Sequence, residues 1–326
     1  MIHAGILGLG VYLPAKKLTN ADLANMVATS DEWIRSRTGI VERRIAGPKE
    51  KTSDLATAAA KNALADARIS PESIDLIIVA TISPDSNFPS VACKVQKNIG
   101  AYNAAAFDVS AACSGFLYAL TTAKQYILSG SAKYILVIAA EKITGLIDWK
   151  DRSTCVLFGD GAGACVVGAI KQGGIIADYL LSYGDQGDLM EVISQEARSP
   201  FDPEKQNIEK MPYVSMKGQD LFKVAVNSMV DAFDRVLVKA GLTKADIDRV
   251  VPHQANDRII SAVAKKLEIP KGKIFVNIDK YGNMSAASIS VALYEAVESG
   301  FIQKGHTVVL VAFGAGLVAG ANVIKW

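Results

Sequence analysis

The stretch Ala67-Arg-Ile-Ser-Pro-Glu-Ser-Ile-Asp75, followed by the apolar run LIIVA over residues 76–80, decides the fold because it occurs twice. Its second copy is Ala240-Gly-Leu-Thr-Lys-Ala-Asp-Ile-Asp248, followed by RVVPH over residues 249–253. The residue numbers of the two copies differ by a constant offset, 240 minus 67, which is 173. Recurrence of one pattern at a fixed spacing indicates an internal duplication.

The same offset relates two further pairs of segments. It places SAACSGFLYAL (110–120) on NMSAASISVAL (283–293), and KYILVIAAE (133–141) on HTVVLVAFG (306–314). Chance similarities would not keep one register across three segments. We therefore predict two similar halves, at residues 1–172 and 173–326.

Each half alternates helical and strand patterns. The expected strands are apolar on both faces, which is typical of sheets covered by helices on both sides. The fold class is thus α/β, with duplicated halves and the functional site between them. Three helices are expected: one from an N-cap at Ser53 to about Arg68, one from near Asn87, and one over 221–240 closed by Gly241. Strands 153–158 and 164–168 are expected to form a hairpin around a turn at 159–163. Residues 183–217 are expected to form an excursion over the surface.

Composition excludes several classes of protein. The 326 residues include 35 Lys and Arg, 33 Asp and Glu and 50% hydrophobic residues, which excludes overall disorder and gives no electrostatic case for nucleic-acid binding. The four Cys show no C-x-x-C spacing, so a reduced, cytoplasmic protein is expected. The N-terminus lacks the basic region of a signal peptide. The uncharged stretch 307–324 contains three Gly, so we expect two buried strands there and no membrane span or membrane partner.

Three side chains that follow predicted strands are candidates for chemistry. Cys113 stands at a strand end and helix start, where free N–H groups and the helix dipole favour a thiolate. His253 directly follows a strand, and Asn283 is the internal counterpart of Ser110. Functional sites of α/β sheets cluster at such strand ends. From the residues alone, an inert buried cysteine, a structural histidine and a turn asparagine remain open.

Six motifs together resemble one family. SDEWIRSRTGI, DVSAACSGFLYAL, FGDGAGA, VPHQANDRII, YGNMSAASI and VAFGAG are similar to bacterial 3-oxoacyl-[acyl-carrier-protein] synthase III of the thiolase superfamily. The resemblance implies a thiolase-like fold and a condensing acyltransferase that initiates type II fatty acid synthesis. An acyl group, acetyl by expectation, would pass from acyl-CoA to Cys113 and then condense with malonyl-carrier protein with loss of CO2. Acyl-CoA would be a substrate, with no permanently bound cofactor and no metal.

The resemblance also implies roles for individual residues. His253 and Asn283 would donate to the enolate oxygen that decarboxylation creates. The oxyanion hole for the acyl thioester would combine the N–H groups of Cys113 and Ala315, with Phe313 as an apolar wall. Ala315 departs from the family, which usually has Gly there.

Further residues would bind CoA or form the dimer. Contacts to CoA are implied for Trp33, Arg37, Arg152, Phe222 and Asn256. Phe88 matches a residue that enters the partner subunit's acyl pocket, so a homodimer is expected.

The helix after His253 carries a candidate docking surface for an acidic carrier protein. Arg258 and Lys265 are seven positions apart and share a stripe opposite the apolar face, with Lys266 nearby. A solvated helix face is the plainer interpretation, and the resemblance favours docking. The full set expected at the carrier protein is Gln254, Ala255, Asn256, Asp257, Arg258, Lys223, Lys265 and Lys266.

Rival functions fit the same residues less well. Degradative thiolases need a second active-site Cys near the C-terminus, and no Cys follows Cys165. Elongating condensing enzymes use a second His where Asn283 stands, and plant-type polyketide synthases usually carry Gly-Pro-Gly where this chain has FGAG. A synthase III homologue of a secondary pathway, a nucleotide-binding module built on Gly8-x-Gly10 or 159–163, and a non-catalytic scaffold remain as alternatives.

Overall fold

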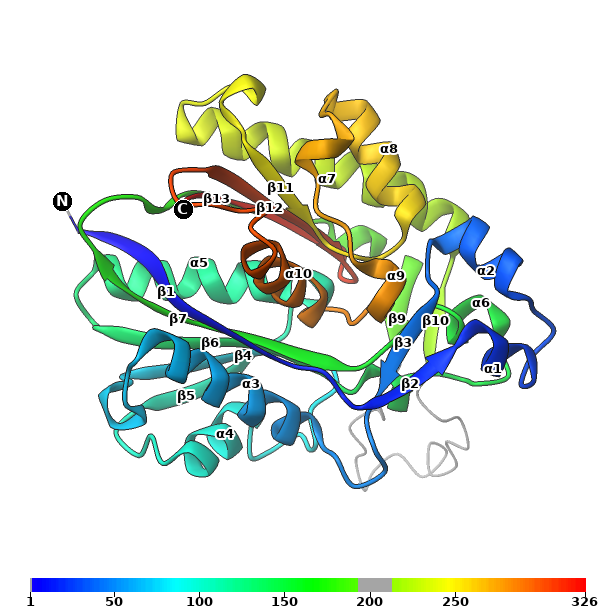
Figure 1. Ribbon diagram of the computed structural model, residues 1–326, viewed down its shortest axis with the longest axis horizontal. Coiled ribbons are helices and arrows are strands. Elements are labelled where there is room, and N and C mark those ends of the chain that lie inside the picture. Colours follow the sequence, from blue (N-terminus) through cyan, green and yellow to red (C-terminus); the bar gives the residue numbers. More distant parts are fainter. Residues whose placement is uncertain (1, 193–212) are drawn as a thin grey trace, which may run out of the picture.

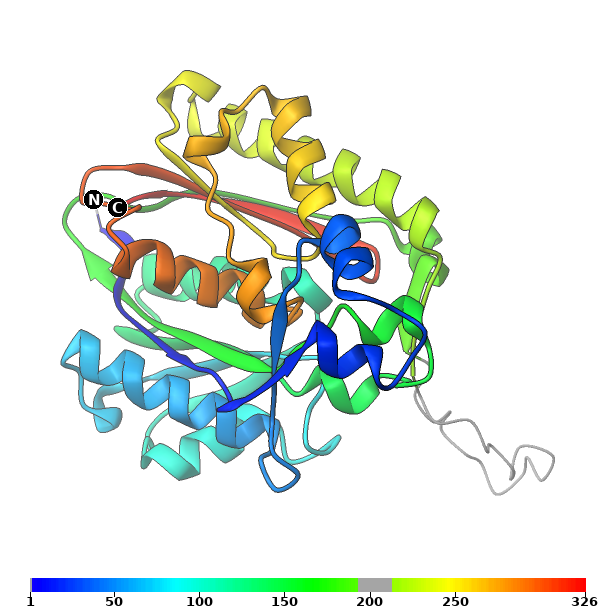
Figure 2. The same ribbon diagram turned by 45° about the vertical axis from the view of Figure 1, so that its right-hand side comes forward.

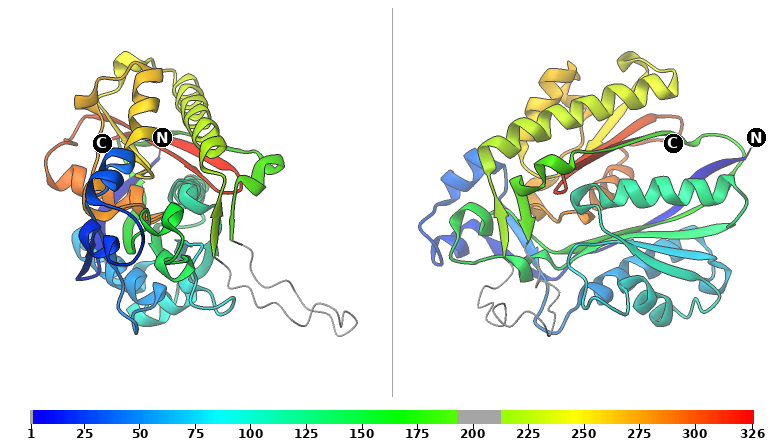
Figure 3. Two further views of the ribbon diagram at one scale, coloured as in Figure 1. Left: turned by 90° about the vertical axis from the view of Figure 1, so that its right-hand side faces the viewer. Right: turned by 180° about the vertical axis from the view of Figure 1, so that it is seen from behind.

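The computed structural model describes residues 2–192 and 213–326 and arranges them in five stacked layers, two sheets alternating with three layers of helices (Figure 1). Side and rear views show the middle helices enclosed between the two sheets (Figure 3). The helix layers are α3 (Thr52–Ala67) with α4 (Val91–Ile99), α5 (Gly115–Leu128) with α10 (Ala287–Glu298), and α7 (Gly218–Ala240) with α8 (Asp257–Leu267).

The first sheet has five strands in the order β1-β7-β6-β4-β5. Strands β6, β4 and β5 run parallel, whereas β7 is antiparallel to both β6 and β1. The carboxyl ends of the three parallel strands therefore meet at one edge. The strands are β1 (His3–Tyr12), β4 (Leu76–Ala80), β5 (Ala105–Val109), β6 (Tyr134–Glu141) and β7 (Gly161–Ile170).

The second sheet repeats this arrangement with four strands in the order β11-β12-β13-β8. The starts of β4 and β11, at residues 76 and 249, keep the offset found in the sequence, as do the starts of β6 and β12, at 134 and 307. The predicted duplication and fold class are therefore confirmed. Helices α5 and α10 share one core with both sheets, so the halves are packed together. The strands are β8 (Gly174–Ser182), β11 (Arg249–Pro252), β12 (Thr307–Gly314) and β13 (Val318–Lys325).

A separate, smaller core joins residues 16–45, which we call the cover, to the segment after β6. The guanidinium of Arg43, fully buried, donates to Asn20 Oδ1 (2.9 Å) within the cover and to the Val156 carbonyl (2.7 Å) outside it. Figure 2 shows α2 beside α8 of the second half, and the two helices are in contact. The elements here are β2 (Lys16–Thr19), α1 (Asn20–Ala24), α2 (Asp31–Thr38), β3 (Glu42–Ile45), α6 (Arg152–Cys155), β9 (Met190–Val192), β10 (Val214–Met216) and α9 (Ile278–Tyr281).

The predicted hairpin over 153–168 is wrong. Residues Arg152–Cys155 form helix α6, and Gly161–Ile170 form one long strand. The glycines serve close packing and not a turn, because a Cβ atom on Gly163 would lie 2.4 Å from Ser290 Oγ of α10.

Two predicted helix starts are also wrong. Helix α3 begins at Thr52 with Lys51 as its N-cap, so Ser53 is an interior residue. Helix α4 begins at Val91 after Ser90, whose hydroxyl accepts from the Cys93 N–H (3.1 Å). Proline at 89 disfavours helical geometry in the residue before it, which delays the start beyond Asn87.

Other sequence predictions are confirmed. Helix α7 ends at Gly241 in the left-handed conformation, and residues 307–325 form two buried strands joined by a Gly-containing turn. No helix in the described part of the chain is long and apolar enough to cross a membrane. Of the expected surface excursion over 183–217, residues 193–212 lie outside the described residues, and the flanks pair as β9 and β10.

Candidate active site

A cavity of about 710 Å³ lies where the two halves meet. Its lining contains all three candidate residues, Cys113, His253 and Asn283. They come from three places: the turn after β5, the residue after β11, and the segment between α9 and α10. The structure therefore brings together side chains from both halves that are far apart in the sequence.

Cys113 lies in a 3-10 turn, Ala112–Ser114, directly before α5. The preceding Ala112 has a positive φ of 42°, a strained conformation for a residue with a side chain. Burial raises the pKa of the Cys113 thiol to about 12. The thiolate expected from the helix dipole is thus disfavoured, because the loss of water on burial outweighs the dipole.

His253 is buried and neutral. Its backbone N–H donates to the Val311 carbonyl (2.8 Å), which fixes the residue to β12. Burial lowers the pKa of His253 to about 3. Neither ring nitrogen has a hydrogen-bond partner in the described residues, so both are available to a ligand.

Asn283 is oriented through its backbone and its side-chain oxygen. Its N–H donates to the Leu157 carbonyl (2.8 Å), and its carbonyl accepts from the Gly159 N–H (3.1 Å). Its Oδ1 accepts from the Ser285 N–H (2.8 Å). Because the oxygen is occupied in this way, the amide NH2 is the part of Asn283 that can donate into the cavity.

Ser285 links Asn283 to the nucleophile. Its hydroxyl lies 3.6 Å from Cys113 Sγ, within hydrogen-bonding range for sulfur. Like Ala112, it has a positive φ, here 49°. Sequence reasoning missed Ser285, although it stands in the quoted YGNMSAASI motif and is the counterpart of Ala112 in the duplication.

Gly314, which sequence reasoning also missed, packs most closely on the nucleophile turn. A Cβ atom built on Gly314 would lie 2.7 Å from the Cys113 backbone nitrogen. Phe313 and Gly314 line the cavity, whereas Ala315, the expected partner in the oxyanion hole, does not. Ala315 packs instead against the core beneath the cover.

The outer part of the cavity contains several of the residues expected at CoA. Two guanidinium groups lie over the Trp33 ring, Arg37 at 4.9 Å and Arg152 at 4.7 Å from its centre. Trp33 and Arg37 line the cavity, whereas Arg152 does not and donates to the Ala28 carbonyl (2.8 Å). The electron-rich face of the indole attracts both guanidinium groups, which keeps the three side chains together.

The wall of the cavity next to α7 and α8 is mostly apolar. Phe222, Leu221 and Met216 line it, and Asn256 contributes a polar group. Asn256 is also the N-cap of α8, with its Oδ1 accepting from the Arg258 N–H (2.8 Å).

The expected carrier-protein residues fall into two groups. Gln254 is buried, and its amide binds the Pro252 carbonyl (2.8 Å) and the Asn277 N–H (3.0 Å), so it is held inside the protein and the expectation of a surface contact is wrong. The others have accessible surface: Ala255, Asn256, Asp257, Arg258, Lys223, Lys265 and Lys266. Of these, Ala255, Asn256, Arg258 and Lys223 line the cavity.

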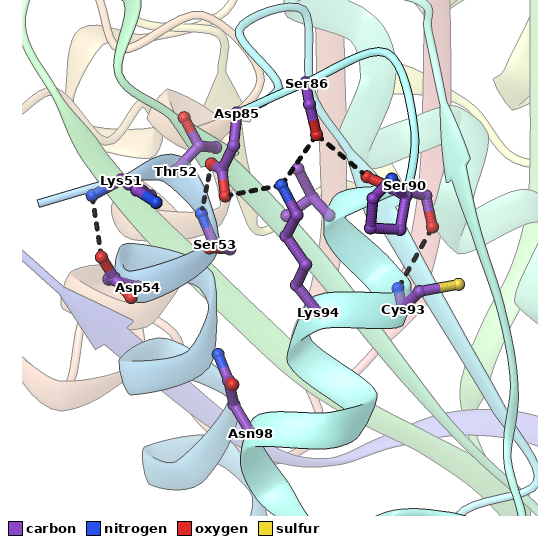
Figure 4. A network of polar contacts seen from close by, with 12 residues as sticks. Lys51, Thr52, Ser53, Asp54, Asp85, Ser86, Ser90, Cys93, Lys94 and Asn98 are labelled. Atoms are coloured by element: carbon purple, nitrogen blue, oxygen red, sulfur yellow. Dashed lines mark hydrogen bonds and ion pairs between the residues drawn. The ribbon is translucent and has the colours of Figure 1, made fainter.

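Phe88 lies outside the cavity of this chain. It is 86% exposed, the largest exposure among the large hydrophobic side chains of the described residues. Its loop between β4 and α4 is nonetheless held in place, because Asp85 accepts from Lys94 Nζ (3.2 Å) and from the Ser53 N–H (3.0 Å) (Figure 4).

Within residues 2–192 and 213–326, no group of three or more His, Cys, Asp or Glu could hold a metal ion.

Comparison with known proteins agrees with this geometry. Residues 107–184 match the family model described as 3-Oxoacyl-[acyl-carrier-protein (ACP)] synthase III, and residues 237–326 match the model of its C-terminal part. The beta-ketoacyl-[acyl-carrier-protein] synthase III of Caldanaerobacter subterraneus is 54% identical over 100% of this chain and 98% of its own, and that of Clostridioides difficile is 52% identical over 99% and 98%. The crystal structure of 3-oxoacyl-[acyl-carrier-protein] synthase III from Aquifex aeolicus superposes with a TM-score of 0.92 at 50% identity, covering 99% of this chain and 100% of that one. This chain belongs to the 3-oxoacyl-[acyl-carrier-protein] synthase III family.

Proposed function

We propose that this protein is a condensing enzyme that starts fatty acid synthesis by joining an acyl group from acyl-CoA to malonyl-carrier protein. The observation that carries the proposal is the meeting of Cys113, His253 and Asn283 in one cavity that extends to Trp33 and Arg37. A nucleophilic sulfur, two neutral donors and a cavity with a largely apolar wall are the parts that this reaction needs.

In the first half-reaction, Cys113 Sγ attacks the thioester carbonyl of acyl-CoA. A new C–S bond forms to Cys113, the C–S bond to CoA breaks, and the thiol proton ends on the CoA sulfur. In this proposal the Cys113 N–H, against which Gly314 packs, donates to the oxyanion of the tetrahedral intermediate. Since burial raises the pKa of the thiol, attack requires the proton to leave as the bond forms.

In the second half-reaction, malonyl-carrier protein loses CO2 and leaves an enolate of its thioester. His253 and Asn283 donate to that enolate oxygen, and the enolate carbon attacks the acyl-Cys113 carbonyl. Because burial lowers the pKa of His253 to about 3, the imidazole stays neutral and donates without placing a full positive charge there. The Cys113 sulfur leaves as a thiolate and takes a proton from solvent, and 3-oxoacyl-carrier protein is released.

The carrier protein docks, in this proposal, on the basic stripe at the cavity mouth. Arg258 and Lys223 line the mouth, and Lys265 is exposed farther along α8. Lys266 Nζ donates to Asn227 Oδ1 of α7 (2.6 Å), which holds it on the same face. An acidic partner would be attracted to these charges and would deliver its thioester into the cavity.

We further propose that two copies of the chain associate through the loop bearing Phe88. A large exposed aromatic ring on a braced loop is suited to insertion into a second copy.

A condensation assay tests the proposal. Acetyl-CoA and malonyl-carrier protein should give 3-oxobutyryl-carrier protein, detected by its intact mass. His253→Ala and Asn283→Ala should each lower condensation by about 10² to 10³ while leaving Cys113 acylation measurable, because the removed donors act on the enolate. Wild-type condensation in both variants, or no product with any short acyl-CoA, would reject the proposal.

A further inference from the structure

A buried carboxylate lies near the nucleophile and has no part in the reaction described above. Glu141 ends β6 and is 0% exposed. Strand β6 is parallel to β4, and β4 to β5, so the strand ends that carry Glu141, Thr81 and the Cys113 turn meet at one edge. Within the described part of the chain, no Lys, Arg or His forms an ion pair with Glu141.

On one side, Glu141 holds the start of the Phe88 loop. Its carboxylate accepts from Thr81 Oγ1 (3.1 Å), the Ile82 N–H (3.2 Å) and Ser83 Oγ (2.5 Å). The rest of the loop is held separately by Lys94, which binds Asp85 (3.2 Å) and Ser86 Oγ (2.9 Å), as Figure 4 shows. The first part of residues 81–90 is therefore fixed by hydrogen bonds to Glu141, and the later part by contacts of Lys94.

On its other side, Glu141 reaches toward Cys113 through Ser285. The Ser285 hydroxyl lies 3.6 Å from Cys113 Sγ, and it also lowers the pKa of Glu141, so it stands between the two groups. The duplication provides an independent check, because Glu141 and Ser285 are the counterparts of Gly314 and Ala112 in the other half. Gly314 packs directly on Ala112, and a Cβ atom on it would lie 3.1 Å from the Ala112 Cβ.

The other charged groups around this edge point elsewhere. Lys142, the next residue, donates from Nζ to the Gly47 (3.0 Å) and Glu50 (2.6 Å) carbonyls. Asp160, before β7, accepts from the Ala46 N–H (2.8 Å). Asp108 of β5 accepts from the Val91 and Ala92 N–H groups at 2.8 Å each. Cys113 is thus the titratable group that faces Glu141 through Ser285.

The negative charge of Glu141 acts on the Cys113 thiol. Burial raises the pKa of Glu141 to about 7, although its hydrogen bonds oppose the shift. Burial is the main reason that the pKa of Cys113 is raised, and the negative charge of Glu141 raises it further. The Ser285 hydroxyl acts in the opposite direction and lowers the pKa of Cys113.

We propose that Glu141 is a positioning residue of the Cys113 site, which holds the first residues of the Phe88 loop and, through Ser285, controls the charge of the thiol. The ionised carboxylate accepts the three loop hydrogen bonds and disfavours a second negative charge on the sulfur. The protonated carboxyl removes that repulsion. The role in acyl transfer rests on the proposed function, but control of the thiol does not.

Alkylation of Cys113 by iodoacetamide, followed peptide by peptide by mass spectrometry across pH, tests this control in the intact protein. Glu141→Gln should move the midpoint of the Cys113 alkylation profile to lower pH. If the midpoint falls by one pH unit, alkylation at any pH well below the midpoint becomes about tenfold faster. The exposed Cys93 is an internal reference, whose rate should not change. An unmoved or upward-shifted midpoint in a folded Glu141→Gln protein would overturn the proposal.

Two further variants separate the thiol effect from the loop effect. Ser285→Ala removes the hydroxyl between the groups and should move the Cys113 midpoint to higher pH, which keeps the test decisive if Glu141→Gln fails to fold. Lys94→Met releases only the far part of the loop, so it should speed hydrogen exchange in residues 81–90 without moving the Cys113 midpoint. Equal shifts of that midpoint in Lys94→Met and Glu141→Gln would mean that loop loosening alone explains the effect. Because no CoA or carrier protein is added, failure here is distinct from failure of the condensation assay.

Discussion

At the scale of single residues, the same backbone strain occurs at two matching positions near the nucleophile. Ala112 and Ser285 are counterparts in the duplication, and both have a positive φ, of 42° and 49°. Such conformations persist only where the surrounding structure imposes them, and they concentrate at functional sites. Here they bring the Cys113 turn and the Asn283 segment together with Gly314 and Glu141 at the ends of β12 and β6.

Gly314→Ala should lower the rate of Cys113 acylation by at least about 100-fold. The added Cβ would lie 2.7 Å from the Cys113 nitrogen and must displace the nucleophile turn, and displacements of about 1 Å have effects of that size. Single-turnover acylation by acetyl-CoA, followed by intact mass, measures the rate. Ala315→Gly is the matched control and should stay within about threefold of wild type, because Ala315 does not line the cavity. A wild-type rate in Gly314→Ala would contradict the assignment of the Cys113 N–H as a donor.

At the scale of elements, Arg43 is a buried polar link between the cover and the segment that follows β6. Its fully buried guanidinium donates to the Leu18 carbonyl (3.1 Å), Asn20 Oδ1 (2.9 Å) and the Val156 carbonyl (2.7 Å). Helix α2 of the cover carries Trp33 and Arg37. Arg43 thereby fixes the part of the chain that would bind the CoA adenine.

Arg43→Met should lower the free energy of unfolding by about 3 kcal/mol, because two buried acceptors and one partly buried acceptor lose their donor. It should also weaken CoA binding, since α2 is no longer held in place. Urea unfolding and calorimetric titration with CoA measure the two effects. The neighbouring Arg44, which donates to the Pro14 carbonyl (3.2 Å) and is only partly buried, provides the control Arg44→Met, with an expected loss under about 1 kcal/mol. Equal losses in both variants would contradict this account of the cover.

Much of the element order could be predicted because the duplication fixes it. The constant offset between the two copies is sufficient to match β4 with β11 and β6 with β12. The hairpin at 153–168 was mispredicted because a Gly-rich stretch is typical of a turn. Here the same glycines allow the strand to pack closely on α10. The pair Glu141 and Ser285 could not be predicted, since their contact exists only after two strand ends and the α9–α10 segment have met.

At the scale of the whole molecule, neutral His253 makes stability depend on pH. Its folded pKa of about 3 lies below the ordinary value of 6.5, so between these values the unfolded chain binds a proton that the folded chain does not. This contribution to stability is present above pH 6.5 and is lost as the pH falls, at up to about 1.4 kcal/mol per pH unit.

His253→Asn should therefore flatten the acid side of the stability curve. Urea unfolding of wild type and variant at pH 7.5 and at pH 5 measures the difference. The loss of stability between the two pH values should be smaller in the variant by about 1–2 kcal/mol. The same loss in both proteins would show that other groups, and not His253, govern acid sensitivity.

Phe88 should govern association of the chain with itself. Phe88→Ser should shift sedimentation from dimer toward monomer at micromolar concentration, because truncation of a central aromatic anchor at an interface costs about 2 kcal/mol or more. The exposed Tyr102, also outside the cavity, gives the control Tyr102→Ser, which should sediment as wild type does. Unchanged association in Phe88→Ser would place the interface elsewhere.

The central claim is that Cys113 carries the acyl group, and the most direct test is the intact mass of the protein after mixing with a panel of short acyl-CoAs. The account predicts a gain of one acyl group on wild type, absent in Cys113→Ala, and the size of the gain across the panel ranks the primers. No gain with any acyl-CoA, or a gain that persists in Cys113→Ala, would contradict it.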